Sequence, residues 1–109
     1  MKGWIGFDLD GTLAEYNGWE GPEHIGAPIM PMVELAKSFI AEGTEIKIFT
    51  ARVSSNNPDR IKSTRAINDW SNKVFGRIID MTSEKDYGMI DLYDDRCHRV
   101  EFNSGRILA

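Results

Sequence analysis

The chain has 109 residues, enough for one domain over residues 1–109 and too few for a second. Its hydrophobic fraction of 41% and charged fraction of 28% are typical of a globular protein with an ordinary core. A net charge of −4 without a basic run disfavours an extended nucleic-acid surface. The single cysteine, Cys97, excludes an internal disulfide, and neither a signal peptide nor a membrane span is apparent, so we expect a cytoplasmic protein that does not bind membranes.

The first predicted element is a strand over about residues 2–8, followed by two aspartates one residue apart, Asp8 and Asp10. A strand that ends there places carboxylates at the edge of the sheet where α/β proteins hold their ligands. Side chains in a strand repeat every second residue, so we expect both carboxylates to point the same way. Like charges this close repel unless a cation or a proton lies between them, which predicts a metal site, a proton-sharing site, or both.

A glycine-rich segment over residues 14–27 follows, and it predicts a long structured loop or flap. Its aromatic residues Tyr16 and Trp19 either line the entrance to a site or pin the loop to the core.

The next segments alternate between helix and strand patterns. Apolar residues at spacings of three and four predict a helix over residues 28–42, and Gly43 is suited to end it. Residues 44–49 are predicted to form a strand that leads into Thr50. A second helix is expected after Asn57 as its N-cap, with Pro58 at its first position. It is predicted to end at Gly76 and to bury Ile61, Ile67, Trp70 and Val74.

Strand patterns dominate the last third of the chain. They cover residues 78–81, residues 89–93, and a hairpin of residues 100–102 and 106–108. Gly105 is suited to the positive φ that the hairpin turn needs. Together, the elements predict an α/β fold of three layers, a Rossmann-like parallel sheet with flanking helices, followed by a C-terminal β-hairpin.

Residues suited to catalysis or ligand binding follow four of the predicted strands. They are Asp8 and Asp10, then Thr50, Lys85, and the pair Asp94 and Asp95. Because the carboxyl ends of parallel strands meet at one edge of a sheet, we expect these side chains to converge there. Carboxylate oxygens suit Mg²⁺, and a hydroxyl and an ammonium group suit phosphoryl oxygens. The set therefore predicts a site for Mg²⁺ and a phosphoryl group.

These motifs, in this order, resemble those of the haloacid dehalogenase-like (HAD) phosphatases. The resemblance rests on Asp8-Leu9-Asp10-Gly11-Thr12-Leu13, on Thr50 in Ile48-Phe49-Thr50-Ala51-Arg52, on Lys85 in Thr82-Ser83-Glu84-Lys85-Asp86, and on Leu92-Tyr93-Asp94-Asp95-Arg96. It spans nearly the whole chain; the first motif is highly specific, whereas the lysine alone would carry no weight. Because the core helices use most of the gaps between motifs, the resemblance implies a small member of the HAD-like fold without a cap domain.

The resemblance also implies a role for each residue. Asp8 would be the nucleophile that forms an aspartyl-phosphate, and Asp10 would be the general acid and then the general base. Mg²⁺ would be held by Asp8, the backbone carbonyl of Asp10, and Asp94, with Asp95 a ligand or a partner of one. Candidate substrate-binding residues are Thr50, Ala51, Arg52, Lys85 and Trp19. Of these, Thr50 and Lys85 would also be catalytic, Thr50 by holding phosphoryl oxygens and Lys85 by offsetting charge on the phosphate and on Asp8. Arg52 either contacts substrate or balances the acidic edge, and Lys62 and Lys73 are competing candidates for the role of Lys85.

The implied activity is Mg²⁺-dependent hydrolysis of a phosphomonoester, either a small molecule or the phosphorylated end of a macromolecule. The alternative is a phosphate-binding or signalling receiver-like module without turnover. A receiver domain carries its phosphorylated aspartate after the third strand, and here that strand leads into Met81-Thr82-Ser83. The sequence therefore favours the enzyme, without indicating its substrate or oligomeric state.

Overall fold

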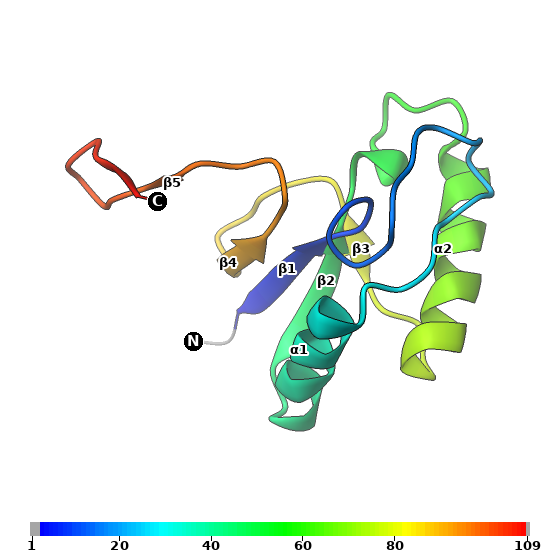
Figure 1. Ribbon diagram of the computed structural model, residues 1–109, viewed down its shortest axis with the longest axis horizontal. Helices are drawn as coiled ribbons and strands as arrows, with labels where there is room; N and C mark the ends of the chain where they lie inside the picture. The colour runs from blue at the N-terminus through cyan, green and yellow to red at the C-terminus, as the bar shows by residue number, and fades with distance from the viewer. Residues whose placement is uncertain (1–2, 109) are drawn as a thin grey trace.

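Four parallel strands form the central sheet in the order β3-β2-β1-β4 (Figure 1). They are β1 (Trp4–Asp8), β2 (Glu45–Phe49), β3 (Met81–Thr82) and β4 (Met89–Tyr93). The computed structural model describes residues 3–108, so residue 2 of the first predicted strand lies outside the described residues. The α/β class and the parallel sheet are confirmed. All four strands end at one edge, as their parallel pairing requires.

Both helices, α1 (Met30–Ala41) and α2 (Arg60–Phe75), pack on the same face of the sheet. The strand order advances one step at a time from β1 to β3, so two right-handed crossovers place their helices on one side. A single apolar cluster joins the strands to both helices; it includes Ile5, Phe7, Ile46, Ile48, Val33, Ala36, Ile67 and Trp70. The prediction of three layers is therefore wrong for the described residues, because the step from β3 to β4 contains no helix.

An aromatic side chain covers part of the helix-free face. Trp4 is only 3% exposed, and its ring stacks on Phe49 with the ring centroids 6.5 Å apart. The connection between β3 and β4 fixes this ring, since Trp4 Nε1 donates to Asp86 Oδ1 at 2.9 Å. The Lys47 ammonium lies 4.9 Å from the centre of the Trp4 ring. Trp4 and this connection thus take the place of a helical layer.

The second helix begins later than its sequence pattern predicts. The side chain of Asn57 accepts from the Asp59 backbone N–H at 3.0 Å and donates to the Arg52 carbonyl at 2.7 Å, so it holds a turn and is not the N-cap. The buried face is built around Ser63, Ile67 and Trp70. Ile61 lies two residues before Ser63, close to the opposite side of the helix, and is 63% exposed. The predicted burial of Ile61 is therefore wrong.

The remaining elements differ from their predictions mainly in length. The first helix begins two residues late, and the third strand is only Met81–Thr82 because its pairing with β2 starts at Met81. The predicted C-terminal hairpin is confirmed as β5 (Arg99–Val100) and β6 (Ile107–Leu108), an antiparallel pair that stands away from the sheet (Figure 1). Among residues 3–108, no helix combines the length and the apolar character needed to cross a membrane.

Candidate functional site

An open pocket of about 380 Å³ lies at the carboxyl edge of the sheet. It is lined by Asp8, Asp10, Tyr16, Trp19, Thr50, Ala51, Arg52, Asn57, Asp95 and Arg96. These residues come from the end of β1, the flap, the segment after β2 and the segment after β4. The parallel sheet thus brings together residues that lie up to 88 positions apart in the chain.

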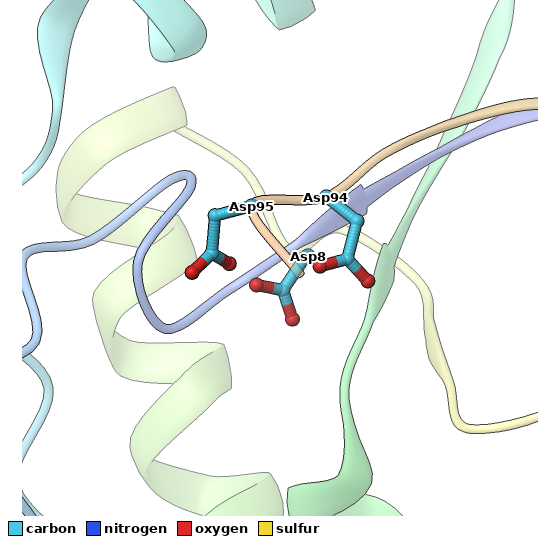
Figure 2. A group of neighbouring side chains, drawn as sticks. All are labelled: Asp8, Asp94 and Asp95. Atoms are coloured by element: carbon cyan, nitrogen blue, oxygen red, sulfur yellow. The ribbon is translucent and has the colours of Figure 1, made fainter. Parts of the chain in front are cut away.

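Three carboxylates form an acidic cluster, which we define as Asp8, Asp94 and Asp95. Each offers an oxygen, and these oxygens all lie within 4.8 Å of one another. Figure 2 shows the Asp8 carboxylate between those of Asp94 and Asp95, with all three side chains extending to the same side. Asp8 is the last residue of β1, and Asp94 and Asp95 directly follow β4, its neighbour in the sheet. These are the described side chains best placed to hold a cation.

The acidic cluster holds an excess of negative charge. Burial of the Asp8 carboxyl, hydrogen bonding with Asp95 and the charges of Asp94 and Asp95 together raise the pKa of Asp8 to about 8. Hydrogen bonding from Thr12 opposes this shift without cancelling it. The cluster thus favours a bound positive charge, either a proton on Asp8 or a cation among the three carboxylates.

Gly11 and Thr12 hold Asp95 against Asp8. The buried Thr12 hydroxyl lies 3.3 Å from Asp8 Oδ2 and 3.2 Å from Asp95 Oδ1, so it can donate to either, and it accepts from the Asp95 backbone N–H at 3.1 Å. Gly11 has a φ of +91°, and a Cβ there would lie 2.7 Å from Asp95 Oδ2. Glycine is therefore required for both the backbone conformation and the close approach of Asp95.

Asp10 is not a member of the acidic cluster, and its carboxylate pairs with Arg52. Arg52 Nε donates to Asp10 Oδ2 at 2.8 Å, and Arg52 Nη2 donates to Asp10 Oδ1 at 2.8 Å. The strand ends at Asp8 and Leu9 lies in a turn, so the two-residue repeat of a strand does not extend to Asp10. The expectation that the carboxylates of Asp8 and Asp10 share one cation or proton is therefore not met.

Thr50 and its neighbours form the wall next to β1. Thr50 is buried, and its hydroxyl oxygen accepts from the Arg52 backbone N–H at 3.1 Å, which leaves the hydroxyl hydrogen free to donate to a ligand. Ala51 and Arg52 belong to η1 (Ala51–Val53), a short 3₁₀ helix that directly follows Thr50, and both line the pocket. Asn57 also lines the pocket, a place that the sequence pattern did not indicate because a capping role accounted for it.

Of two basic residues near the acidic motifs, Lys85 does not lie where it was expected. Lys85 is exposed and does not line the pocket; it lies in the connection from β3 to β4, next to the Asp86 that binds Trp4 on the helix-free face. Arg96 does line the pocket, beside Asp95. The structure therefore brings together every predicted site residue except Lys85, with Asp94 joining through the acidic cluster.

The flap, which we define as residues 15–27, covers one side of the pocket. Its ends are held together, since the Glu15 N–H donates to the Ala27 carbonyl at 2.8 Å. Trp70 of α2 donates from Nε1 to the Gly26 carbonyl at 3.0 Å, which fixes the end of the flap to the core. Trp19 is 55% exposed, with its ring centre 4.8 Å from the Arg52 guanidinium carbon. Of the two roles expected for Trp19, the structure shows it at the pocket and not in the core.

No protein-family model matches this chain, and no solved structure matches it. The chemistry of the site is therefore inferred from its own residues. A carboxylate in an acidic cluster, a buried hydroxyl and a second carboxylate that lines the same pocket form a set that could accommodate a phosphoryl group.

Proposed function

We propose that this protein is a Mg²⁺-dependent phosphomonoester hydrolase of the haloacid dehalogenase-like type, acting through an aspartyl-phosphate. One observation carries the proposal: Asp8 lies at the centre of an acidic cluster, in the same pocket as Thr50 and Asp10. These residues also match the motifs that the sequence shares with this family.

The donor set of the acidic cluster fits a hard divalent cation. Mg²⁺ binds carboxylate and carbonyl oxygens, and the pKa of Asp8 is raised by burial of its carboxyl and by the neighbouring Asp94 and Asp95, an effect that a bound cation would oppose. Asp8, Asp94 and the backbone carbonyl of Asp10 would hold the ion, with Asp95 as a ligand or as a partner of one. Bound there, Mg²⁺ would offset negative charge on the phosphoryl oxygens and would favour the ionised form of Asp8.

In the first step, an Asp8 oxygen attacks phosphorus from the side opposite the ester oxygen. The new bond joins Asp8 to phosphorus, the phosphorus–ester oxygen bond breaks, and the leaving oxygen takes its proton from Asp10. Thr50 and the backbone of Ala51 hold phosphoryl oxygens at the pocket wall. Arg96 lines the pocket as a further positive charge.

In the second step, water attacks the aspartyl-phosphate. Asp10, now a carboxylate, takes a proton from the water, the water oxygen bonds to phosphorus, and the bond between phosphorus and Asp8 breaks. Inorganic phosphate leaves, and both aspartates return to their starting states. Two carboxylates with different surroundings suit these two roles.

The shape of the pocket supports a broad class of substrates. It is open to solvent at one edge and carries the exposed aromatic residues Tyr16 and Trp19 at its wall. A phosphorylated small molecule or the phosphorylated end of a macromolecule would fit such a site. A cytoplasmic location is part of the same proposal, as expected from the single cysteine.

The alternative, a receiver-like module, receives less support from the order of the elements. Strand β3 is followed by Ser83, and the acidic residues follow β1 and β4. A phosphate-binding module without turnover would use the same pocket, so the test must measure turnover as well as binding.

The test is phosphate release from 4-nitrophenyl phosphate and from a panel of phosphorylated metabolites and oligonucleotides. We expect turnover with Mg²⁺, its loss with EDTA, and no turnover by Asp8→Asn, which serves as the blank. Activity that survives EDTA unchanged would overturn the metal assignment. Phosphate binding by calorimetry without any turnover across the panel would favour the binding module.

A further inference from the structure

The Asp10–Arg52 pair is the most completely bonded polar contact of the pocket. The Arg52 side chain is only 6% exposed. It donates one hydrogen bond to each oxygen of Asp10, and this bidentate geometry fixes the plane of the carboxylate. Each Asp10 oxygen keeps a second lone pair, so the pair orients the carboxylate without using all of its acceptor capacity.

The same guanidinium also holds the flap. Arg52 Nη1 donates to the Pro22 carbonyl at 3.3 Å, and the Trp19 ring lies on the guanidinium with 4.8 Å between ring centre and Cζ. The other flap anchors, at Ala27 and Gly26, hold only its ends. Among the hydrogen bonds of residues 3–108, the one from Arg52 to Pro22 therefore ties the middle of the flap to the body of the protein.

The pair also lies between two cavities. A second cavity of about 300 Å³ lies under the flap, and Asp10, Tyr16 and Arg52 line both it and the main pocket. A residue in this place can act on substrate directly or act through Asp10 and the flap. The three side-chain hydrogen bonds of Arg52 go to Asp10 and Pro22, which commits three of its five N–H donors to the protein itself.

We infer that Arg52 is a positioning residue that orients Asp10 and couples it to the flap, and that it is not a ligand for the substrate phosphate. This rests on the proposed function for the role of Asp10 in proton transfer. The sequence left two roles open for Arg52, contact with the substrate and balance of the acidic edge, and the positioning role excludes the first. It also connects the flap to Asp10, a carboxylate that takes part in the proposed reaction.

The first test measures flap release and needs no turnover. A glutamate-specific protease can cut at Glu15, Glu20 and Glu23 in the flap, and mass spectrometry identifies the cuts. We expect Arg52→Ala to raise the cleavage rate in the flap by at least about fivefold, because the open population grows when the anchor is lost. Arg60→Ala is the matched control, since Arg60 is exposed and lines neither cavity. Equal flap cleavage in both variants would overturn the coupling.

The second test separates positioning from phosphate binding with a double-mutant cycle on 4-nitrophenyl phosphate. Arg52→Ala alone should lower kcat/KM by roughly 10- to 100-fold, the effect of a misplaced catalytic group. In an Asp10→Asn background, Arg52→Ala should lower kcat/KM by no more than about twofold, because Arg52 acts through Asp10. If Arg52→Ala lowered kcat/KM by the same roughly 10- to 100-fold in that background, through a higher KM, Arg52 would bind the phosphate and the inference would be overturned.

A conservative variant guards against a simple folding defect. Arg52→Lys keeps the charge but cannot form the paired hydrogen bonds, so it should fold, as checked by circular dichroism, and still release the flap. Full rescue of both flap protection and kcat/KM by lysine would show that charge alone suffices and would overturn the positioning role. The protease test does not depend on activity. If the wild type showed no phosphatase activity while Arg52→Ala still raised cleavage in the flap, the result would contradict the proposed function and leave the link between Arg52 and the flap standing.

Discussion

Asp8 and Asp10 are two residues apart, yet their carboxylates have opposite electrostatic surroundings. Asp8 lies among other carboxylates in the acidic cluster, whereas Asp10 is paired with a buried arginine. One side of the pocket therefore favours a proton on Asp8 or a cation from solution, and the other carries its cation within the chain. The difference arises at Leu9, where the strand ends and the backbone turns before Asp10.

The comparison assigns different chemical tasks to the two carboxylates. A carboxylate among like charges is held at a cost in stability and gains most from a metal ion. A carboxylate held by an arginine fork has a fixed orientation, which suits a group that must give and take a proton at one position. The predictions below test whether these two sides of the pocket behave as differently as their surroundings suggest.

The largest expected effect is that of Asp8→Asn. An amide cannot attack phosphorus, so turnover should fall by at least about 10⁴-fold, the scale of losing a nucleophile. The variant should stay folded and melt at a higher temperature in EDTA than the wild type, because its amide is neutral in the acidic cluster without taking up a proton on folding. Phosphate release and thermal melts measure both. A wild-type rate would show that another residue is the nucleophile.

Asp10→Asn should have a smaller effect of a different kind. Loss of proton transfer should lower kcat by roughly 10²- to 10⁴-fold, while Mg²⁺ binding to the acidic cluster persists. Calorimetry with Mg²⁺ alone measures the second point. Loss of Mg²⁺ binding in this variant, with the fold intact, would show that the two sides of the pocket are not independent.

The acidic cluster also predicts how stability depends on pH. In the folded, metal-free chain Asp8 holds its proton up to about pH 8, whereas in the unfolded chain it ionises near its ordinary value of 3.8. The folded state therefore binds more protons between these values, so the stability of the metal-free protein should fall as pH rises from about 4 to about 8. Thermal melts in EDTA across this range measure the slope.

Two controls sharpen the pH prediction. Asp8→Asn should flatten the slope, since its side chain does not titrate. Mg²⁺ should raise the melting temperature more at pH 8 than at pH 5, because a cation replaces the proton that Asp8 would otherwise hold. An identical slope in the variant and the wild type would place the titrating group elsewhere.

Much of the sheet and several site residues were predictable because they depend on local patterns. Strand β4 matches its prediction, and the carboxyl edge gathers Asp8, Thr50 and Asp95 as parallel pairing requires. The shortage of helix in the last thirty residues already indicated one thinly covered face, but the cover that Trp4 provides was not predictable, since it depends on a contact with Asp86, 82 residues away.

The partners of the site residues were harder to predict than their positions. The pairing of Asp10 with Arg52 depends on where the strand ends, and a shift of one or two residues lies within the uncertainty of any boundary drawn from sequence. The role of Asn57 was hidden because an asparagine before a proline also suits a helix cap. Sequence patterns thus located the edge of the sheet and did not assign each side chain its partner.

Lys85 provides the smallest expected effect and a test of how far the family resemblance extends. The resemblance gives it the task of balancing the phosphate, yet it is exposed outside the pocket, on the connection between β3 and β4. A long side chain that reaches the pocket from solvent makes a screened contact worth about 1 kcal/mol, so Lys85→Ala should lower kcat/KM by roughly fivefold. Lys62→Ala and Lys73→Ala, on α2, are the matched controls and should have no effect. A hundredfold loss for Lys85→Ala alone would mean that this connection moves toward the pocket during turnover. A loss no larger than that of the controls would leave Arg96 and Thr50 to hold the phosphate, and the resemblance would then extend to the aspartates and the threonine but not to the lysine.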